Sequence, residues 1–190
     1  MNHKLFGGDW VKTWIRHLEK VLSKTKAGIW AYSTPYRNIV QREIDLAGIN
    51  ASDTVLFIGA GSIPFTPILL VRLTGARVIT IERDVDAYEN ALKVIKKADM
   101  THEITVLHDD GSAPLDVDYQ VLIFALQASP MAKLLRTHSR KNARTIIRRA
   151  SEAYQQEYDQ PPDAIMIIDE ATHGMRAFEK SQLITYTPEQ

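Results

Sequence analysis

The 190-residue chain contains no cysteine, which excludes disulfides and thiolate metal sites. It also has no excess of either charge, because 23 lysines and arginines balance 23 aspartates and glutamates. A balanced charge argues against general binding of polyanions. No apolar run approaches the roughly 20 residues that a membrane span requires, and no signal-like segment follows the start. We therefore expect a cytoplasmic protein.

The composition is that of an ordinary globular protein, with 45% hydrophobic and 24% charged residues. A chain of this length is enough for one compact domain with a core. Its six histidines show no metal-ligand spacing, so a metal site is not expected.

Helical periodicity dominates the first forty-odd residues. Apolar residues recur at helical spacing over 11–22, behind a candidate N-cap at Asp9. A second helix is expected to have Pro35 in its first turn. These patterns predict an N-terminal helical extension over residues 1–50, followed by a ligand-binding domain over 51–190.

Beyond residue 50, short apolar runs alternate with helical segments. Such alternation predicts a doubly wound, Rossmann-like α/β sheet, mostly parallel and covered on both faces. The five expected strands are "TVLFIG", "ARVITIE", "EITVLH", "YQVLIFAL" and "DAIMIID".

Between the last two expected strands, a further buried helix is predicted from an apolar stripe: Ala143, Ile146, Ile147, Ala150 and Ala153. Arginines at every fourth position would then form a solvated helix face opposite the stripe: Arg140, Arg144 and Arg148. The alternative is a phosphate-contacting surface for RNA, which the zero net charge disfavours.

A glycine turn ends the first expected strand, where a doubly wound sheet binds its ligands. Gly59 and Gly61 would let the backbone approach a ligand closely. Glu82 ends the second strand 21 residues after Gly61, a spacing that suits a carboxylate accepting from ribose hydroxyls. The alternatives are a structural turn and a solvated strand end, but the combination favours nucleoside binding.

The nucleoside is indicated by two further features. Pro64 stands where a dinucleotide fingerprint would place a third small residue. Asp109 and Asp110 follow the third strand. One of them would accept a hydrogen bond from an adenine amino group, and Asp110 is favoured for this. The other would shape the turn before Gly111. Adenosine without a diphosphate points to S-adenosylmethionine.

With these residues in place, the sequence resembles class I S-adenosylmethionine-dependent transferases, and more narrowly the nicotianamine synthase family. The likeness covers roughly residues 30–188. It is carried by "FIGAGSIPFTPILL", by "ATHGMRAF" over 171–178, and by the shorter "TPYRN" over 34–38.

The resemblance implies transfer of a 3-amino-3-carboxypropyl group to an amine, with release of methylthioadenosine. It places Tyr36 near the reacting centre, although packing on a helix's apolar face is an alternative. Glu43 shares that face, where its carboxylate would aid proton removal or would simply lie at an exposed edge. Arg176 would clamp a carboxylate or lie on the surface.

The predicted cofactor site draws on the glycine turn, two strand ends and two later loops. For His173 there is an alternative to cofactor binding, because a structural hydrogen bond would explain a histidine at this position equally well. The site comprises Gly59, Ala60, Gly61, Ser62, Pro64, Thr66, Glu82, Asp109, Asp110, Leu126 and His173.

The chain also departs from the family pattern. The acidic residue that the family carries upstream of the tyrosine has only Asp9 and Glu19 as stand-ins. The segment "SQLITYTPEQ" leaves no room for a final antiparallel strand, so the sheet is expected to be shortened at its C-terminus. An open sheet edge would then be available to a second subunit as a homodimer.

Three alternative functions stay open at this point. They are methyl transfer on the same scaffold, a non-catalytic nucleoside-binding module, and a dinucleotide-dependent oxidoreductase, which Pro64 disfavours. The acceptor, described only as an amine-bearing small molecule, is not determined by the sequence.

Overall fold

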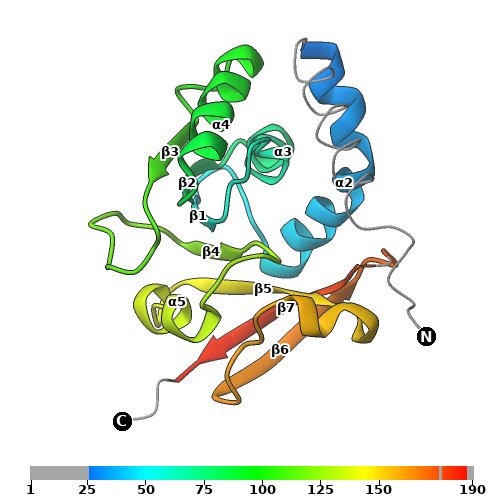
Figure 1. Cartoon of the computed structure of the whole chain (residues 1–190), viewed down its shortest axis with the longest axis vertical. Helices are drawn as coiled ribbons and strands as arrows, with labels where there is room; N and C mark the ends of the chain where they lie inside the picture. Colours follow the sequence, from blue (N-terminus) through cyan, green and yellow to red (C-terminus); the bar gives the residue numbers. More distant parts are fainter. Residues whose placement is uncertain (1–25, 176, 188–190) are drawn as a thin grey trace, which may run out of the picture.

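The computed structural model describes residues 26–187 apart from residue 176, with side chains from residue 36 onward. Helices and strands alternate along most of the chain (Figure 1). No helix in this described part combines the length and apolar character needed to cross a bilayer. The elements are α2 (Lys26–Ala47), β1 (Thr54–Ile58), α3 (Phe65–Thr74), β2 (Arg77–Glu82), α4 (Val85–Ala98), β3 (Ile104–His108), β4 (Val121–Phe124), α5 (Met131–His138), β5 (Arg144–Ala150), the 3-10 helix η1 (Glu152–Glu157), β6 (Ile165–Thr172) and β7 (Phe178–Tyr186).

The seven strands form one sheet in the order β3-β2-β1-β4-β5-β7-β6. Strands β1 to β5 pair in parallel, and β7 lies antiparallel between β5 and β6. The winding reverses at β1, which places the end of β1 at the point where such sheets bind their ligands. The predicted doubly wound sheet is confirmed.

Two apolar cores cover the two faces of this sheet. Successive strand residues point to opposite faces, so Val55 and Phe57 of β1 enter one core while Leu56 and Ile58 enter the other. The first core packs against α2, α3 and α4, and the second packs against α5 (Figure 1). This burial on both faces explains the almost wholly apolar central strands.

The predicted buried helix over 143–153 is wrong, because this segment is strand β5. Ile146 lies in the core beneath α2, and Ile147 lies in the opposite core, as alternation in a strand requires. The arginines therefore do not form a solvated helix face. Arg148 and Arg144 instead make ion pairs on the α2 side of the sheet.

The prediction of a sheet shortened at its C-terminus is also wrong. Residues Phe178–Tyr186 form β7, which pairs with both β5 and β6. The segment that was expected as a buried strand is β6, which lies at the edge of the sheet and is largely exposed. The carboxyl half of the sheet is thus complete.

Helix α2 also differs from its prediction, since it runs from Lys26 straight through Pro35 rather than beginning beside it. Its C-terminal half packs on α3 and on β5, β6 and β7. The helix predicted over 11–22, with Asp9 and Glu19, lies outside the described residues.

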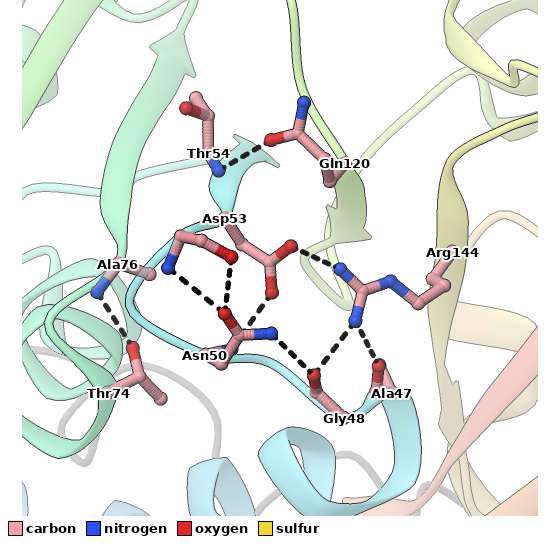
Figure 2. Close-up of polar contacts among 10 residues, drawn as sticks. Ala47, Gly48, Asn50, Asp53, Thr54, Thr74, Ala76, Gln120 and Arg144 are labelled. Atoms are coloured by element: carbon pink, nitrogen blue, oxygen red, sulfur yellow. Dashed lines mark hydrogen bonds and ion pairs between the residues drawn. The ribbon is translucent and has the colours of Figure 1, made fainter.

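A partly buried ion pair joins the C-terminus of α2 to the sheet (Figure 2). Arg144 at the start of β5 donates to the carbonyl oxygens of Ala47 (2.7 Å) and Gly48 (2.9 Å), and it pairs with the Asp53 carboxylate. Asp53 in turn accepts from the Asn50 N–H at 2.9 Å. One guanidinium therefore caps the helix and fixes the loop that leads into β1.

Candidate active site

The glycine turn lies at the carboxyl end of β1. Gly59 and Gly61 have φ angles of +98° and +66°, which residues other than glycine rarely adopt. A Cβ on Gly59 would lie 2.9 Å from the Ala125 Cβ, whereas one on Gly61 would meet no atom within 4 Å. Gly59 is thus required by packing against the neighbouring strand end, and Gly61 faces open space.

Glu82 at the end of β2 is held against this turn. Its carboxylate accepts from the N–H of Gly61 at 2.7 Å and from the N–H of Asp84 at 3.0 Å. The side chain is buried, and it borders the same cavity as the turn. The 21-residue spacing in the sequence therefore corresponds to a direct contact.

A cavity of about 790 Å³ opens beside the turn and Glu82. It extends along one face of α4 and reaches the loops that follow β3 and β4. Its polar lining is Ser62, Glu82, Arg83, Asp84, Asp86, Asn90, Lys93, Lys97, Asp109, Asp110, Gln127 and Ser129.

Asp109 and Asp110 both line the cavity and both shape their own turn. Asp109 accepts from the N–H of Gly111 (2.7 Å), and Asp110 accepts from the N–H of Ser112 (2.8 Å). The pKa of Asp110 is lowered, chiefly by its hydrogen bonds with Ser112. Asp110 is the more exposed of the two, so its carboxylate is accessible to a ligand.

A buried histidine supports this turn from below. The Nε2 of His138 lies 2.8 Å from the carbonyl oxygen of Gly111. A Cβ on Gly111 would lie 2.9 Å from Leu134, so the turn packs tightly on α5. Burial lowers the pKa of His138, which keeps the imidazole neutral.

Glu43 of α2 has no solvent exposure, so its interpretation as an exposed edge residue is wrong. Arg148 binds its carboxylate with two hydrogen bonds, at 2.8 Å from Nε and 2.7 Å from Nη2. The same Nη2 donates to the Thr66 hydroxyl at 3.0 Å. The ion pair thus connects α2 and β5 to the start of α3.

Glu43 is also connected by hydrogen bonds to β7 and to the turn between β6 and β7. The Ser181 hydroxyl donates to Glu43 Oε1 at 2.6 Å, and His173 Nε2 lies 2.9 Å from the Ser181 oxygen. Thr66, Glu43 and His173, which were predicted from separate motifs, therefore meet in one buried network.

Tyr36 lies on the same face of α2 as Glu43, closer to the N-terminus of the helix. Its ring stacks on Phe65, the first residue of α3, with 5.7 Å between centroids and 10° between planes. It also packs against the core, as the alternative interpretation of this residue expected. The ring thus lies beside the segment that leaves the glycine turn.

Other predicted site residues are farther from the cavity lining. Ala60, Pro64 and Thr66 are buried, and Leu126 is half-buried, but none of the four lines the cavity. Pro64 directly precedes α3, where its carbonyl oxygen accepts from the Ile68 N–H at 3.1 Å. Arg176 lies outside the described residues.

Two groups of residues were missed by the sequence reasoning. Asn90, Lys93 and Lys97 line the cavity from one face of α4, yet their spacing is also that of any solvated helix face. Arg148 had a detectable signal, because a charged residue inside an apolar strand needs a buried partner. The mistaken helix prediction placed Arg148 on a solvated face, so its need for a buried partner was not recognised.

No protein-family model matches the chain. In sequence it is 30% identical over 106 residues to the L-histidine 2-aminobutanoyltransferase of Yersinia pestis. The matched stretch is 54% of this chain and only 39% of that relative's length.

Solved structures share the fold at lower identity. A variant of the nicotianamine synthase MtNAS in complex with S-adenosylmethionine superimposes with a TM-score of 0.78 at 20% identity, covering 91% of this chain and 72% of that one. MtNAS in complex with MTA and tNA gives 0.77 at 20% identity, covering 90% and 69%. The mitomycin 7-O-methyltransferase MmcR gives 0.62 at 11% identity, covering 83% and 54%. The chain therefore has the class I S-adenosylmethionine-dependent methyltransferase fold, in a form similar to that of nicotianamine synthase.

Proposed function

We propose that this protein is an S-adenosylmethionine-dependent transferase that moves a 3-amino-3-carboxypropyl group to the amine of a small molecule in the cytoplasm. The observation that carries the proposal is the cavity at the carboxyl end of β1, bordered by the Gly59–Gly61 turn and the buried Glu82 carboxylate. The similarity to an aminobutanoyltransferase favours this group over methyl.

The residues around the cavity fit an adenosyl ligand. Gly61 leaves open space where any side chain would intrude. Glu82 keeps lone pairs for ribose hydroxyls, since each of its oxygens accepts only one backbone hydrogen bond. Asp110, on the loop after β3, offers an acceptor for the adenine amino group.

When bound here, S-adenosylmethionine supplies an electrophilic carbon beside a sulfonium that leaves as a neutral thioether. The chain's own task is to hold the acceptor amine in line with that carbon and to keep it unprotonated. Tyr36 is proposed to orient the amine from α2, because its ring is fixed against Phe65 at the exit of the glycine turn.

Methyl transfer is the second candidate, and it is favoured by one observation. The same fold is shared with an O-methyltransferase over 83% of this chain. The two reactions leave different products, S-adenosylhomocysteine for methyl transfer and methylthioadenosine for aminocarboxypropyl transfer.

The test is mass spectrometry of the small molecules formed when the purified protein meets S-adenosylmethionine and a pool of amino acids and polyamines. We expect methylthioadenosine above the rate without protein, together with an acceptor that has gained the aminocarboxypropyl mass. Glu82→Ala, which removes the carboxylate from the cavity, is the matched control and should lose both signals. S-adenosylhomocysteine with a methylated acceptor would establish the second candidate instead.

A further inference from the structure

The hydrogen bonds around His173 determine which of its nitrogens carries the proton. Glu43 is paired with Arg148, so its carboxylate can only accept, and the Ser181 hydroxyl must donate its proton to it. The Ser181 oxygen therefore accepts from His173 Nε2, 2.9 Å away. Nε2 carries the hydrogen, and Nδ1 is left with a bare lone pair.

This Nδ1 atom is buried, and within the described part of the chain it has no hydrogen-bond partner. A buried polar atom without a partner is destabilising, so its presence calls for a physical reason. The ring is fixed from its other sides by Ser181 and by Phe178, whose ring centroid lies 4.5 Å away.

The imidazole is also neutral, as a proton acceptor must be. Burial is the main cause that lowers the pKa of His173, and the positive charges of Arg148 and Arg42 lower it further. Glu43 opposes them and raises it. The net direction leaves Nδ1 unprotonated at neutral pH.

We propose that His173 Nδ1 is the general base that takes a proton from the acceptor amine, while Ser181 and Glu43 position the ring and stabilise the imidazolium that forms. The inference rests on the proposed amine acceptor. One N–H bond of the acceptor ammonium breaks, one N–H bond forms at Nδ1, and the positive charge moves from ammonium to imidazolium. The amine is left with a free lone pair for attack.

His173 lies in the turn between β6 and β7, outside the lining of the cavity beside Glu82. Hydrogen bonds through Ser181, Glu43 and Arg148 connect His173 to Thr66. Thr66 directly follows Phe65, which stacks on Tyr36. The neighbouring Gly174 is exposed, has a φ of +68°, and has open space where a Cβ would be. Because Nδ1 is buried, the role requires this turn to move when the acceptor binds.

The first test measures the tautomer and needs no turnover. Long-range proton–nitrogen NMR of histidine-labelled protein should show a neutral His173 with the proton on Nε2 and none on Nδ1 at pH 7.5. Ser181→Ala should abolish this preference, because the acceptor for the Nε2 proton is then lost. A proton on Nδ1 in the unmodified protein would overturn the proposal.

The second test uses His173→Gln, whose amide can still donate to Ser181 but cannot take a proton. We expect kcat/KM to fall at least 100-fold at pH 7 and to rise about tenfold per pH unit toward the pKa of the amine, because only the already neutral amine reacts. The unmodified protein should instead reach a plateau near neutral pH. The exposed His102→Gln is the matched control and should keep the original profile.

The two tests separate this inference from the proposed function. His173→Gln with activity within threefold and an unchanged pH profile would overturn the base. A protein that transferred nothing to any amine would refute the proposed function, while the NMR result would still decide the tautomer. The far-UV circular dichroism spectrum of His173→Gln should match that of the unmodified protein, which excludes misfolding as the cause.

Discussion

The Glu82 carboxylate makes two backbone hydrogen bonds, and through them it holds the glycine turn against the end of β2. A single carboxylate thus shapes the turn and faces the cavity. Glu43 is a contrasting case, since it is wholly buried and fully occupied by Arg148 and Ser181. These two acidic residues therefore have different tasks, one toward the ligand and one toward other side chains.

Replacing Glu82 with alanine should weaken S-adenosylmethionine binding by about 10- to 150-fold, which corresponds to the loss of hydrogen bonds to a charged group. Isothermal titration calorimetry gives the dissociation constant directly. Glu103→Ala is the control, because Glu103 is exposed and does not line the cavity. Equal affinity in the two variants would show that Glu82 serves the turn alone.

Replacing Glu43 with glutamine should lower the free energy of unfolding by about 3 kcal/mol, because Arg148 would keep a buried charge without its partner. Urea denaturation measures the loss. The double variant Glu43→Gln with Arg148→Met should be more stable than Glu43→Gln alone, since the unpaired charge is then removed. A Glu43→Gln loss no larger than that of the exposed Asp45→Asn would contradict this interpretation.

At the scale of elements, α2 is attached to the sheet at two points. Its C-terminus is capped by Arg144, and Glu43, one turn before that end, joins it to β5 and β7 (Figure 2 shows the first of these). Helix α2 is therefore packed directly on the sheet that carries the cavity. This attachment fixes Tyr36 relative to α3.

Arg144→Met should lower the free energy of unfolding by about 1–3 kcal/mol. The range is below that of a fully buried pair because the Arg144 side chain is 35% exposed, although Asp53 is only 5% exposed. Thermal and urea unfolding should agree on the loss. Arg136→Met, at an exposed position of α5, should change stability by less than about 0.5 kcal/mol.

His138, at the end of α5, supports the loop after β3 and should make the stability of the protein sensitive to acid. The folded-state pKa of this residue lies below its ordinary value of 6.5, so the unfolded chain binds the proton more readily. The stability that neutral His138 contributes is present above pH 6.5 and is lost as the pH falls toward the folded-state pKa. The slope is at most about 1.4 kcal/mol per pH unit for one proton.

Urea unfolding between pH 7 and pH 5 checks this expectation. His138→Gln, whose amide can still donate to Gly111, should flatten the decline. His102→Gln, at an exposed position, should leave it unchanged. An unaltered slope in His138→Gln would assign the acid sensitivity to other groups.

At the scale of the whole molecule, strand β6 lies at the edge of the sheet, and within the described residues it pairs only with β7 (Figure 1). Three consecutive apolar residues on it are exposed: Met166 (64%), Ile167 (49%) and Ile168 (57%). An exposed apolar edge strand is a template for pairing with another chain. We therefore propose that two copies associate through β6.

Light scattering coupled to size-exclusion chromatography should show a dimer at micromolar concentration. Ile168→Lys should shift it to the monomer, because an edge lysine opposes strand pairing. Val85→Lys, another exposed apolar position but on α4, is the control and should leave the mass unchanged. A monomer in the unmodified protein would refute the association.

The sequence by itself determined the features that depend on residues close together in the chain. The apolar runs that became β1 to β4, the glycine turn, and the strand-end Glu82 all follow from local pattern and spacing. Helix α3 likewise ends at Gly75, in the left-handed conformation that its residue type favours. Local backbone preferences are strong enough to decide such elements.

The tertiary structure alone decided β5, β7 and the surroundings of Glu43. Residues 143–150 have apolar spacing compatible with a helix or a strand, and pairing with β4 and β7 selects the strand. Glu43 is buried because Arg148, 105 residues later, brings a compensating charge to it. Contacts between distant residues carry free energies larger than local preferences, and a single sequence does not reveal which distant residues will meet.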